Sequence, residues 1–277
     1  MDRTRVVQLR SWEEFLDEIS RRRTGAADSP PTADGVLSDL LFRGQEDATW
    51  ELETTLERYL RCEKTNVLEY FRVLSAVARR VESATARRWD LPTLNDYERA
   101  WTGAKGFPRA DFPAYEFMAY ARHHGFPSPL LDWTHSPYIA AYFAYAFSSQ
   151  PPGGSVAIYV YREYGGSVKM TKGGTPQIRE LGPYVRTHPR HFLQQSQYTV
   201  CWQRDDSGAY YCRHDLVFGE KRGRQDLLWK YELPASEADR VLSELDLSNL
   251  NAYSLFGSED SLFHTLAFRE LRDLRET

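Results

Sequence analysis

The chain has 277 residues, of which 42% are hydrophobic and 14% aromatic, enough to fill a sizeable core. Its 35 basic and 39 acidic residues give a net charge of −4, which excludes a global attraction to nucleic acid or membranes but not a local basic face. No membrane span or signal peptide is evident, and the three cysteines lack metal-site spacing, so we expect a cytoplasmic protein with no membrane association and no metal site.

The first predicted elements are a helix and a strand separated by a loop. Residues 11–14, Ser-Trp-Glu-Glu, form a capping-box pattern that predicts a helix start. Four apolar residues then share one helical face: Trp12, Phe15, Leu16 and Ile19. Residues 23–36 are rich in Gly, Ala, Ser, Pro and Asp, which predicts an exposed loop. The apolar run 36–42 predicts a strand that ends at residues 43–45, Arg-Gly-Gln.

A second helix is predicted over about residues 66–88, and a short one near 97–101. Apolar residues at helical spacing define the inward side of the longer helix: Leu68, Phe71, Leu74 and Val81. Its arginines have two open interpretations, a solvated helix face or a contact with nucleic acid: Arg79, Arg80, Arg87 and Arg88.

Residues 115–147 contain the stretch around which we expect the chain to be organised. A first helix ends at Gly125, and two prolines, Pro127 and Pro129, prevent its continuation. A buried pair of leucines leads into a polar elbow, residues 132–136, which contains Asp132, Trp133, Thr134 and Ser136. Ser136 followed by a proline predicts the start of a buried apolar helix over 137–147. Polar groups between buried helices are costly unless they are paired or used, so the elbow is a candidate site.

The remaining pattern predicts strands over 155–162 and 227–233, and a turn that feeds a strand over 188–202. A helix over about 237–246, capped by Ser236, and a last helix from near Ser258 follow. We therefore predict one α+β domain over residues 1–277, with an N-terminal helix and loop (10–35), a core (36–234) and C-terminal helices (235–277).

Several polar residues in these elements are candidates for chemistry, each with a structural alternative. The Arg43 guanidinium can hold a phosphate or ribose, or form a salt bridge with Asp132. His123 and His124, at a helix C-terminus, suit either an imidazolium or a cap. Hydroxyls and amides complete the set and can bind a ligand or serve as caps and core contacts: Thr134, Ser136, Gln194, Gln195 and Gln197.

Motifs of the common enzyme classes are missing from the sequence. We find no Gly-rich phosphate loop, no Gly-x-Ser-x-Gly elbow and no His-Glu-x-x-His or Cys-x-x-Cys pair. A conventional Rossmann dehydrogenase, kinase, serine hydrolase or zinc enzyme is therefore not expected.

Three motifs resemble those of the FRG-domain family. Residues 42–45, Phe-Arg-Gly-Gln, followed by Trp50 and by Leu-Glu-Arg at 56–58, are similar to its opening motif. Residues 123–134, His-His-Gly-Phe-Pro-Ser-Pro-Leu-Leu-Asp-Trp-Thr, are similar to its central motif, His-Tyr-Gly-x-Pro-Thr-Arg-Leu-Leu-Asp-Trp-Thr. Residues 189–198 resemble its third motif and 230–234 its closing strand. The chain departs from the family pattern at four positions: Arg122, His124, Pro129 and Ser196.

The resemblance implies a fold and an activity. The family looks related to ADP-ribosyltransferases and occurs in bacterial toxin–antitoxin and phage-defence loci, so the resemblance implies a mixed or antiparallel sheet with long helical insertions. It also implies an NAD-dependent transferase whose order of parts is matched by Arg43, then Thr134 and Ser136, then Gln194, Gln195 and Gln197. No counterpart of the usual transferase glutamate is identified in the sequence.

On this reading Arg43 and Gln45 lie at the NAD diphosphate or ribose, with Asp132 as an anchor. His123 and Thr134 bind the nicotinamide end, and Ser136 is a further residue that binds NAD. Tyr142 or Trp133 stacks on a ring, and a glutamine of 194–197 orients the ribose or acceptor. The acceptor is expected to be RNA, with DNA and protein open, and an antitoxin is a possible partner. A non-catalytic nucleotide- or partner-binding module and an NAD glycohydrolase are the alternatives.

Overall fold

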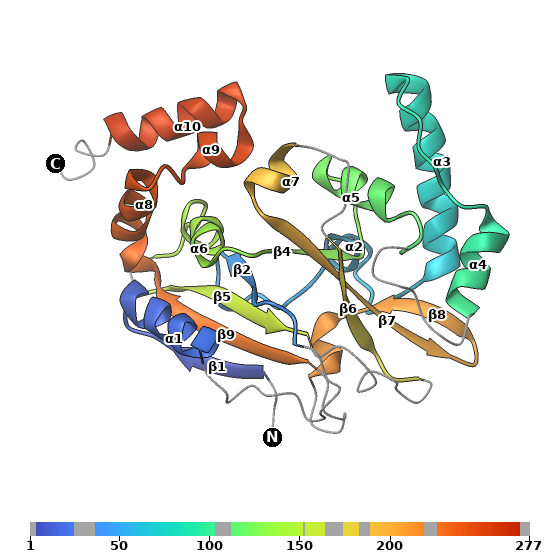
Figure 1. Cartoon of the computed structure of the whole chain (residues 1–277), viewed down its shortest axis with the longest axis horizontal. Helices are drawn as coiled ribbons and strands as arrows, with labels where there is room; N and C mark the ends of the chain where they lie inside the picture. Colours follow the sequence, from blue (N-terminus) through green and yellow to red (C-terminus); the bar gives the residue numbers. More distant parts are fainter. Residues whose placement is uncertain are drawn as a thin grey trace.

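The computed structural model describes residues 4–24, 37–102, 112–151, 153–163, 174–182, 189–218 and 226–271. Its strands form one curved sheet in the order β1-β9-β5-β2-β4-β7-β8-β3, and β6 pairs with β7 (Figure 1). The strands are β1 (Thr4–Gln8), β2 (Leu41–Gln45), β3 (Lys64–Asn66), β4 (Leu130–Thr134), β5 (Ser155–Arg162), β6 (Gln177–Leu181), β7 (Ser196–Asp205), β8 (Gly208–Cys212) and β9 (Leu227–Pro234). The β1–β9 pair is parallel and the other pairs are antiparallel.

The helices pack against the two halves of this sheet. They are α1 (Trp12–Thr24), α2 (Thr55–Leu60), α3 (Val67–Thr85), α4 (Leu94–Thr102), α5 (Tyr115–His123), α6 (Pro137–Tyr145), α7 (Pro189–Leu193), α8 (Ala238–Leu247), α9 (Ala252–Phe256) and α10 (Glu259–Glu270). One core lies between α1, α6 and α8 and strands β2, β5 and β9. A second lies between α3, α4 and α5 and strands β7 and β8. A third covers the opposite face of the central strands and includes Trp133 and Tyr161.

Helix α6 crosses β2 at Gly44. A Cβ atom on Gly44 would lie 2.0 Å from the Ala140 carbonyl oxygen and 2.6 Å from the Ala144 amide nitrogen, both in the α6 backbone. Glycine is therefore required here by close backbone approach. The Phe-Arg-Gly sequence thus brings the buried helix directly against the strand that carries Arg43.

The α+β prediction and the mixed, largely antiparallel sheet are confirmed, as are the strand over 155–162 and the helix cap at Ser258. Gly125 has the positive φ (80°) expected after α5. The division of the chain into core and flanking parts stays a prediction. Among the described helices, none has the length and apolar character needed to cross a bilayer.

Several boundaries differ from the predictions. Ser236 lies in a short 3-10 turn, and α8 begins at Ala238 with no side-chain cap, so the expected cap there is wrong. Helix α6 ends at Tyr145 rather than at residue 147. The expected turn before β7 contains the short helix α7, and α2, β1, β3, β6 and β8 were not predicted. Of the expected loop over 23–36, residues 23 and 24 belong to α1 and 25–36 lie outside the described residues.

Candidate active site

A cavity of about 780 Å³ opens where strands β2 and β4 diverge. Within the described residues, the ladder between these strands consists of the single pair Phe42↔Thr134. Beyond this pair the strands are not hydrogen-bonded to each other, so side chains from both faces of the sheet can meet in the gap. The four residues that we expected to converge, Arg43, His123, Asp132 and Thr134, all line this cavity.

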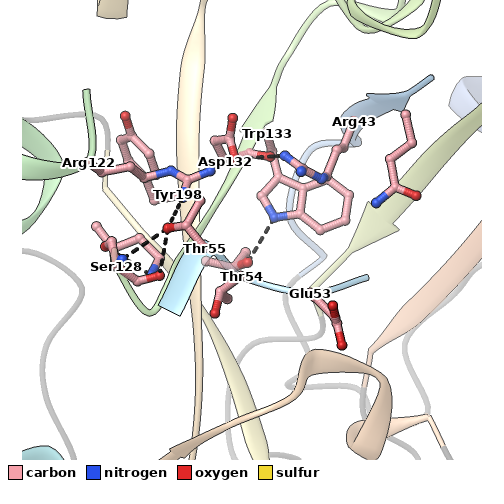
Figure 2. Close-up of polar contacts among 12 residues, drawn as sticks. Arg43, Glu53, Thr54, Thr55, Arg122, Ser128, Asp132, Trp133 and Tyr198 are labelled. Atoms are coloured by element: carbon pink, nitrogen blue, oxygen red, sulfur yellow. Dashed lines mark hydrogen bonds and ion pairs between the residues drawn. The ribbon is translucent and has the colours of Figure 1, made fainter. Parts of the chain in front are cut away.

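Two arginines flank one carboxylate at the centre of the cavity (Figure 2). Nη1 of Arg43 donates to Oδ1 of Asp132 at 2.7 Å and to its backbone oxygen at 3.0 Å. Arg122, from α5, forms an ion pair with the same Oδ1 atom. The salt bridge considered for Arg43 is therefore present. Nε of Arg43 is buried and has no hydrogen-bond partner among the described residues.

The carboxylate faces the cavity more than the guanidinium groups do. The Asp132 side chain is 47% exposed, against 14% for Arg43 and 12% for Arg122. Burial by itself raises the pKa of the Asp132 carboxyl, but the positive charges of Arg122 and Arg43 outweigh it and hold that pKa well below its usual range. Asp132 is therefore ionised in the folded protein at neutral pH.

A hydrogen-bond network fixes the Arg122 side chain. Its Nη1 donates to Oγ1 of Thr55 at 3.0 Å, and Thr55 also accepts the backbone N–H of Ser128 at 3.0 Å (Figure 2). These contacts join α2, α5 and the loop before β4. Because the second Arg122 nitrogen binds Asp132, the guanidinium has a defined orientation in the cavity wall.

His123 contacts β7. Its Nε2 lies 3.0 Å from the hydroxyl of Tyr198, which is the cross-strand neighbour of Asp132. Burial, followed by the negative charge of Asp132, raises the pKa of Tyr198, so the phenol is neutral and available for hydrogen bonding. His123 and Tyr198 together form the wall of the cavity beside α5.

The other predicted residues are divided between the cavity and the core. Gln45, Thr134 and Gln194 line the cavity. The Thr134 hydroxyl donates to the Gln194 carbonyl oxygen at 2.8 Å, and the Gln194 amide donates to the Leu255 carbonyl oxygen at 3.2 Å. These contacts join β4, α7 and α9 at one end of the cavity.

The alternation of side chains along β4 and β7 directs two of the predicted site residues, Trp133 and Gln197, away from the cavity. Trp133 lies between Asp132 and Thr134, so its indole points to the opposite face, where Nε1 donates to Thr199 and the ring packs on Tyr161 at 5.4 Å. Its side chain is therefore part of the core, although the residue borders the cavity. Gln197 is likewise buried on that face and donates to Glu180 at 2.7 Å.

Three further predicted residues do not line the cavity. Ser136 caps α6 by accepting the Ile139 N–H at 3.3 Å, so its structural alternative is observed. Gln195 has a left-handed backbone (φ 45°) in the turn before β7. The Tyr142 ring packs in the core of α6 and borders a different cavity, between α6 and the C-terminal helices, which corrects the expectation that it stacks on a ring of the same ligand.

The cavity also contains residues that the sequence did not single out. These are the aromatic residues Trp50, Phe143 and Phe256, the arginines Arg58, Arg122 and Arg190, and the carboxylates Glu46, Glu51 and Glu53. Trp50, Arg58 and Arg190 lie inside the family motifs, so the motifs could have pointed to them. Phe256 could not be found in this way, because α9 is distant in sequence.

Glu46 differs from the other carboxylates of the cavity. Glu51 binds Arg213, Glu53 lies 3.8 Å from it, and Asp132 is neutralised by two arginines. Among the described residues no cation pairs with Glu46. Burial raises the pKa of its carboxyl.

Comparisons with known proteins give one match. No curated protein and no solved structure matches this chain. Residues 38–151, which include β2, α5, β4 and α6, match the family model of the FRG domain. This match contains Arg43, Arg122, His123, Asp132 and Thr134 and so covers the centre of the cavity. The chain thus contains a match to the FRG domain over residues 38–151.

Proposed function

We propose that the cavity binds NAD and that the protein transfers ADP-ribose from it to an acceptor. The observation that carries this proposal is the combination of inward guanidinium groups, aromatic rings and an uncompensated carboxylate in one cavity of about 780 Å³. Guanidinium groups bind diphosphates, aromatic rings stack on planar bases, and a carboxylate stabilises a cationic ribose. NAD offers a partner for each of them: a diphosphate, planar bases and a ribose that becomes cationic as nicotinamide leaves.

In this proposal Arg43 and Arg122 face the diphosphate. Both are already oriented by Asp132, which reduces the ordering that ligand binding requires. The unpartnered Nε atom of Arg43 gives it a donor that Asp132 does not use. Gln45 contributes a further polar group: its Oε1 atom is buried without a partner among the described residues.

The reaction breaks the bond between the ribose and nicotinamide and forms one between the ribose and the acceptor, which loses a proton. Positive charge develops on the ribose as nicotinamide leaves, and we assign the carboxylate that faces this charge to Glu46. We place the nicotinamide end beside His123 and Thr134, and Gln194 orients the ribose or acceptor. Trp50, Phe143 or Phe256 takes the stacking role expected of Tyr142 or Trp133.

We further propose that the protein is a toxin or anti-phage effector with a nucleic-acid acceptor, RNA rather than DNA, and that an antitoxin neutralises it. The family resemblance supports this role, and the local arginines support the acceptor. Inducible expression tests it: the wild type is expected to slow growth and Arg43→Ala is expected to lose this effect.

The direct test uses labelled NAD with separate RNA, DNA and protein pools. Transfer of label to one pool supports the transferase, and free ADP-ribose without transfer supports an NAD glycohydrolase. Glu46→Gln is expected to lower turnover at least tenfold with NAD affinity nearly unchanged, because its charge matters mainly in the transition state. Glu51→Gln, whose wild-type carboxylate is paired with Arg213, is the matched control.

A non-catalytic binding module is the second candidate. It is favoured by the hydrogen bonds of Thr134 and Gln194, which hold the cavity wall together and leave these side chains in structural contacts. Isothermal titration of NAD and an assay of nicotinamide release separate the two: NAD binding without nicotinamide release in the presence of each of the RNA, DNA and protein pools supports this candidate and contradicts the transferase.

A further inference from the structure

Helix α3 and the residues that follow it carry an exposed set of arginines, called here the arginine face: Arg72, Arg79, Arg80, Arg87 and Arg88. Residues 67–90 contain these five arginines and three acidic residues, although the whole chain has a net charge of −4. Helices α3 and α4 stand at one end of the molecule, opposite α8–α10 (Figure 1). The positive charge is therefore concentrated on one projecting element.

Most of this charge is not neutralised within the protein. Among the described residues, no carboxylate forms an ion pair with Arg72, Arg79, Arg80 or Arg88. The nearby Glu82 carboxylate instead accepts the backbone N–H of Trp89 at 2.6 Å. Arg72 and Arg79 also line a groove of about 440 Å³ between α3 and residues 89–94. These four arginines of the arginine face are thus available to an external polyanion.

A row of tilted aromatic contacts leads from the arginine face to helix α5, which carries His123. The Arg87 guanidinium lies 4.2 Å from the centroid of Trp89 and 4.9 Å from that of Tyr120. Trp89 and Tyr120 are 4.5 Å apart, and Tyr120 is 4.4 Å from the exposed ring of His124. Tyr120 belongs to the same helix, α5, as His123, which lines the cavity, so the row of rings lies on a helix that forms part of the cavity wall.

We propose that a single-stranded polynucleotide binds along this surface, with phosphates on the arginine face and a base stacked on His124. Guanidinium groups bind phosphates bidentately, and bases stack on aromatic rings, whereas an acidic peptide would use only the charges. A strand bound in this way lies against α5, the helix that carries His123 in the cavity wall. Its role as acceptor rests on the proposed function, but the binding itself does not.

The test is fluorescence anisotropy of the full chain with a labelled 20-nucleotide RNA and the DNA of the same sequence. Arg79→Gln/Arg80→Gln is expected to weaken binding at least tenfold and to reduce the slope of log K against log salt by about 1.4, the value for two phosphate contacts on a single strand. The matched control is Arg21→Gln/Arg269→Gln, which removes two charges from α1 and α10, at side chains 73% and 44% exposed, and is expected to change affinity less than twofold.

The stacking step has its own pair of variants. His124→Ala is expected to weaken binding about fivefold or more, and His124→Phe to retain it, because a ring is needed but a charge is not. The RNA and DNA arms show which polynucleotide is preferred.

The proposal is overturned if both double variants lose affinity equally, if polyglutamate competes as well as unlabelled RNA, or if the wild type binds neither strand at 50 mM salt. NAD consumption is measured separately, with the RNA, DNA and protein pools each added in turn. Polynucleotide binding without NAD consumption in any pool refutes the transferase and leaves this surface intact, and NAD consumption without polynucleotide binding does the reverse.

Discussion

The substitution Gly44→Ala tests whether the contact between β2 and α6 shapes the cavity. The new Cβ atom would lie 2.0 Å from the Ala140 oxygen and 2.6 Å from the Ala144 nitrogen, distances that real Cβ atoms do not show. Both atoms are backbone, so no side-chain rotation relieves the clash, and α6 must move away from β2 by about 1 Å. We expect a cost of about 3 kcal/mol, the upper end of the range for overpacked cores.

Urea unfolding followed by circular dichroism measures this cost, and ligand affinity reports the displacement of the neighbouring Arg43. Gly154→Ala is the control, since its nearest contacts are to the flexible Gln150 side chain, and a loss below about 1 kcal/mol is expected there. Adding Ala140→Gly to Gly44→Ala should give no rescue, because the clash is with backbone. A Gly44→Ala loss below about 0.5 kcal/mol, or full rescue by Ala140→Gly, would refute the close-approach argument.

Three other predictions follow from the site. Arg43→Lys should lose NAD turnover nearly as fully as Arg43→Ala while circular dichroism stays unchanged, since an ammonium cannot replace a bidentate fork; retained turnover would count against the diphosphate role. Because the pKa of Asp132 is lowered, its ion pairs stabilise the fold fully above about pH 4, the ordinary Asp value, and this stabilisation is lost as the pH falls further. In Asp132→Asn the loss of stability below about pH 4 that is due to Asp132 should disappear from the acid-unfolding curve. A curve identical to that of the wild type would contradict the pairing. Phe143 is only partly buried and lines the cavity, whereas Ile139 is buried. Phe143→Ala should therefore lower the free energy of unfolding in urea by less than Ile139→Ala, for which a loss of about 2–5 kcal/mol is expected. The reverse order would place Phe143 in the core.

Local sequence determined the elements whose signals are short-range. The caps at Ser136 and Ser258, the glycine after α5 and the apolar periodicity of α3 each act within one or two helical turns, and these elements formed as predicted. The central motif predicted a polar elbow that contains Asp132 and Thr134. The structure instead extends strand β4 to Thr134, and alternation along this strand puts the two side chains on the same face.

The signals failed where a neighbouring strand decides the structure. The edge strand β3 is three residues long and is defined by its pairing with β8. Serine is a residue type that often caps helices, but Ser236 lies in a 3-10 turn that leads into α8. No side chain caps the N-terminus of α8.

The tertiary structure decided how the predicted polar residues meet in the cavity and which others join them. Arg43 and Arg122 meet at Asp132 because β2 and β4 separate after one ladder pair, a feature of the sheet rather than of either strand. The same alternation that gathers Asp132 and Thr134 sends Trp133 and Gln197 into the core. Sequence spacing determines faces within one strand, but the distance between two strands depends on the packing of the whole sheet.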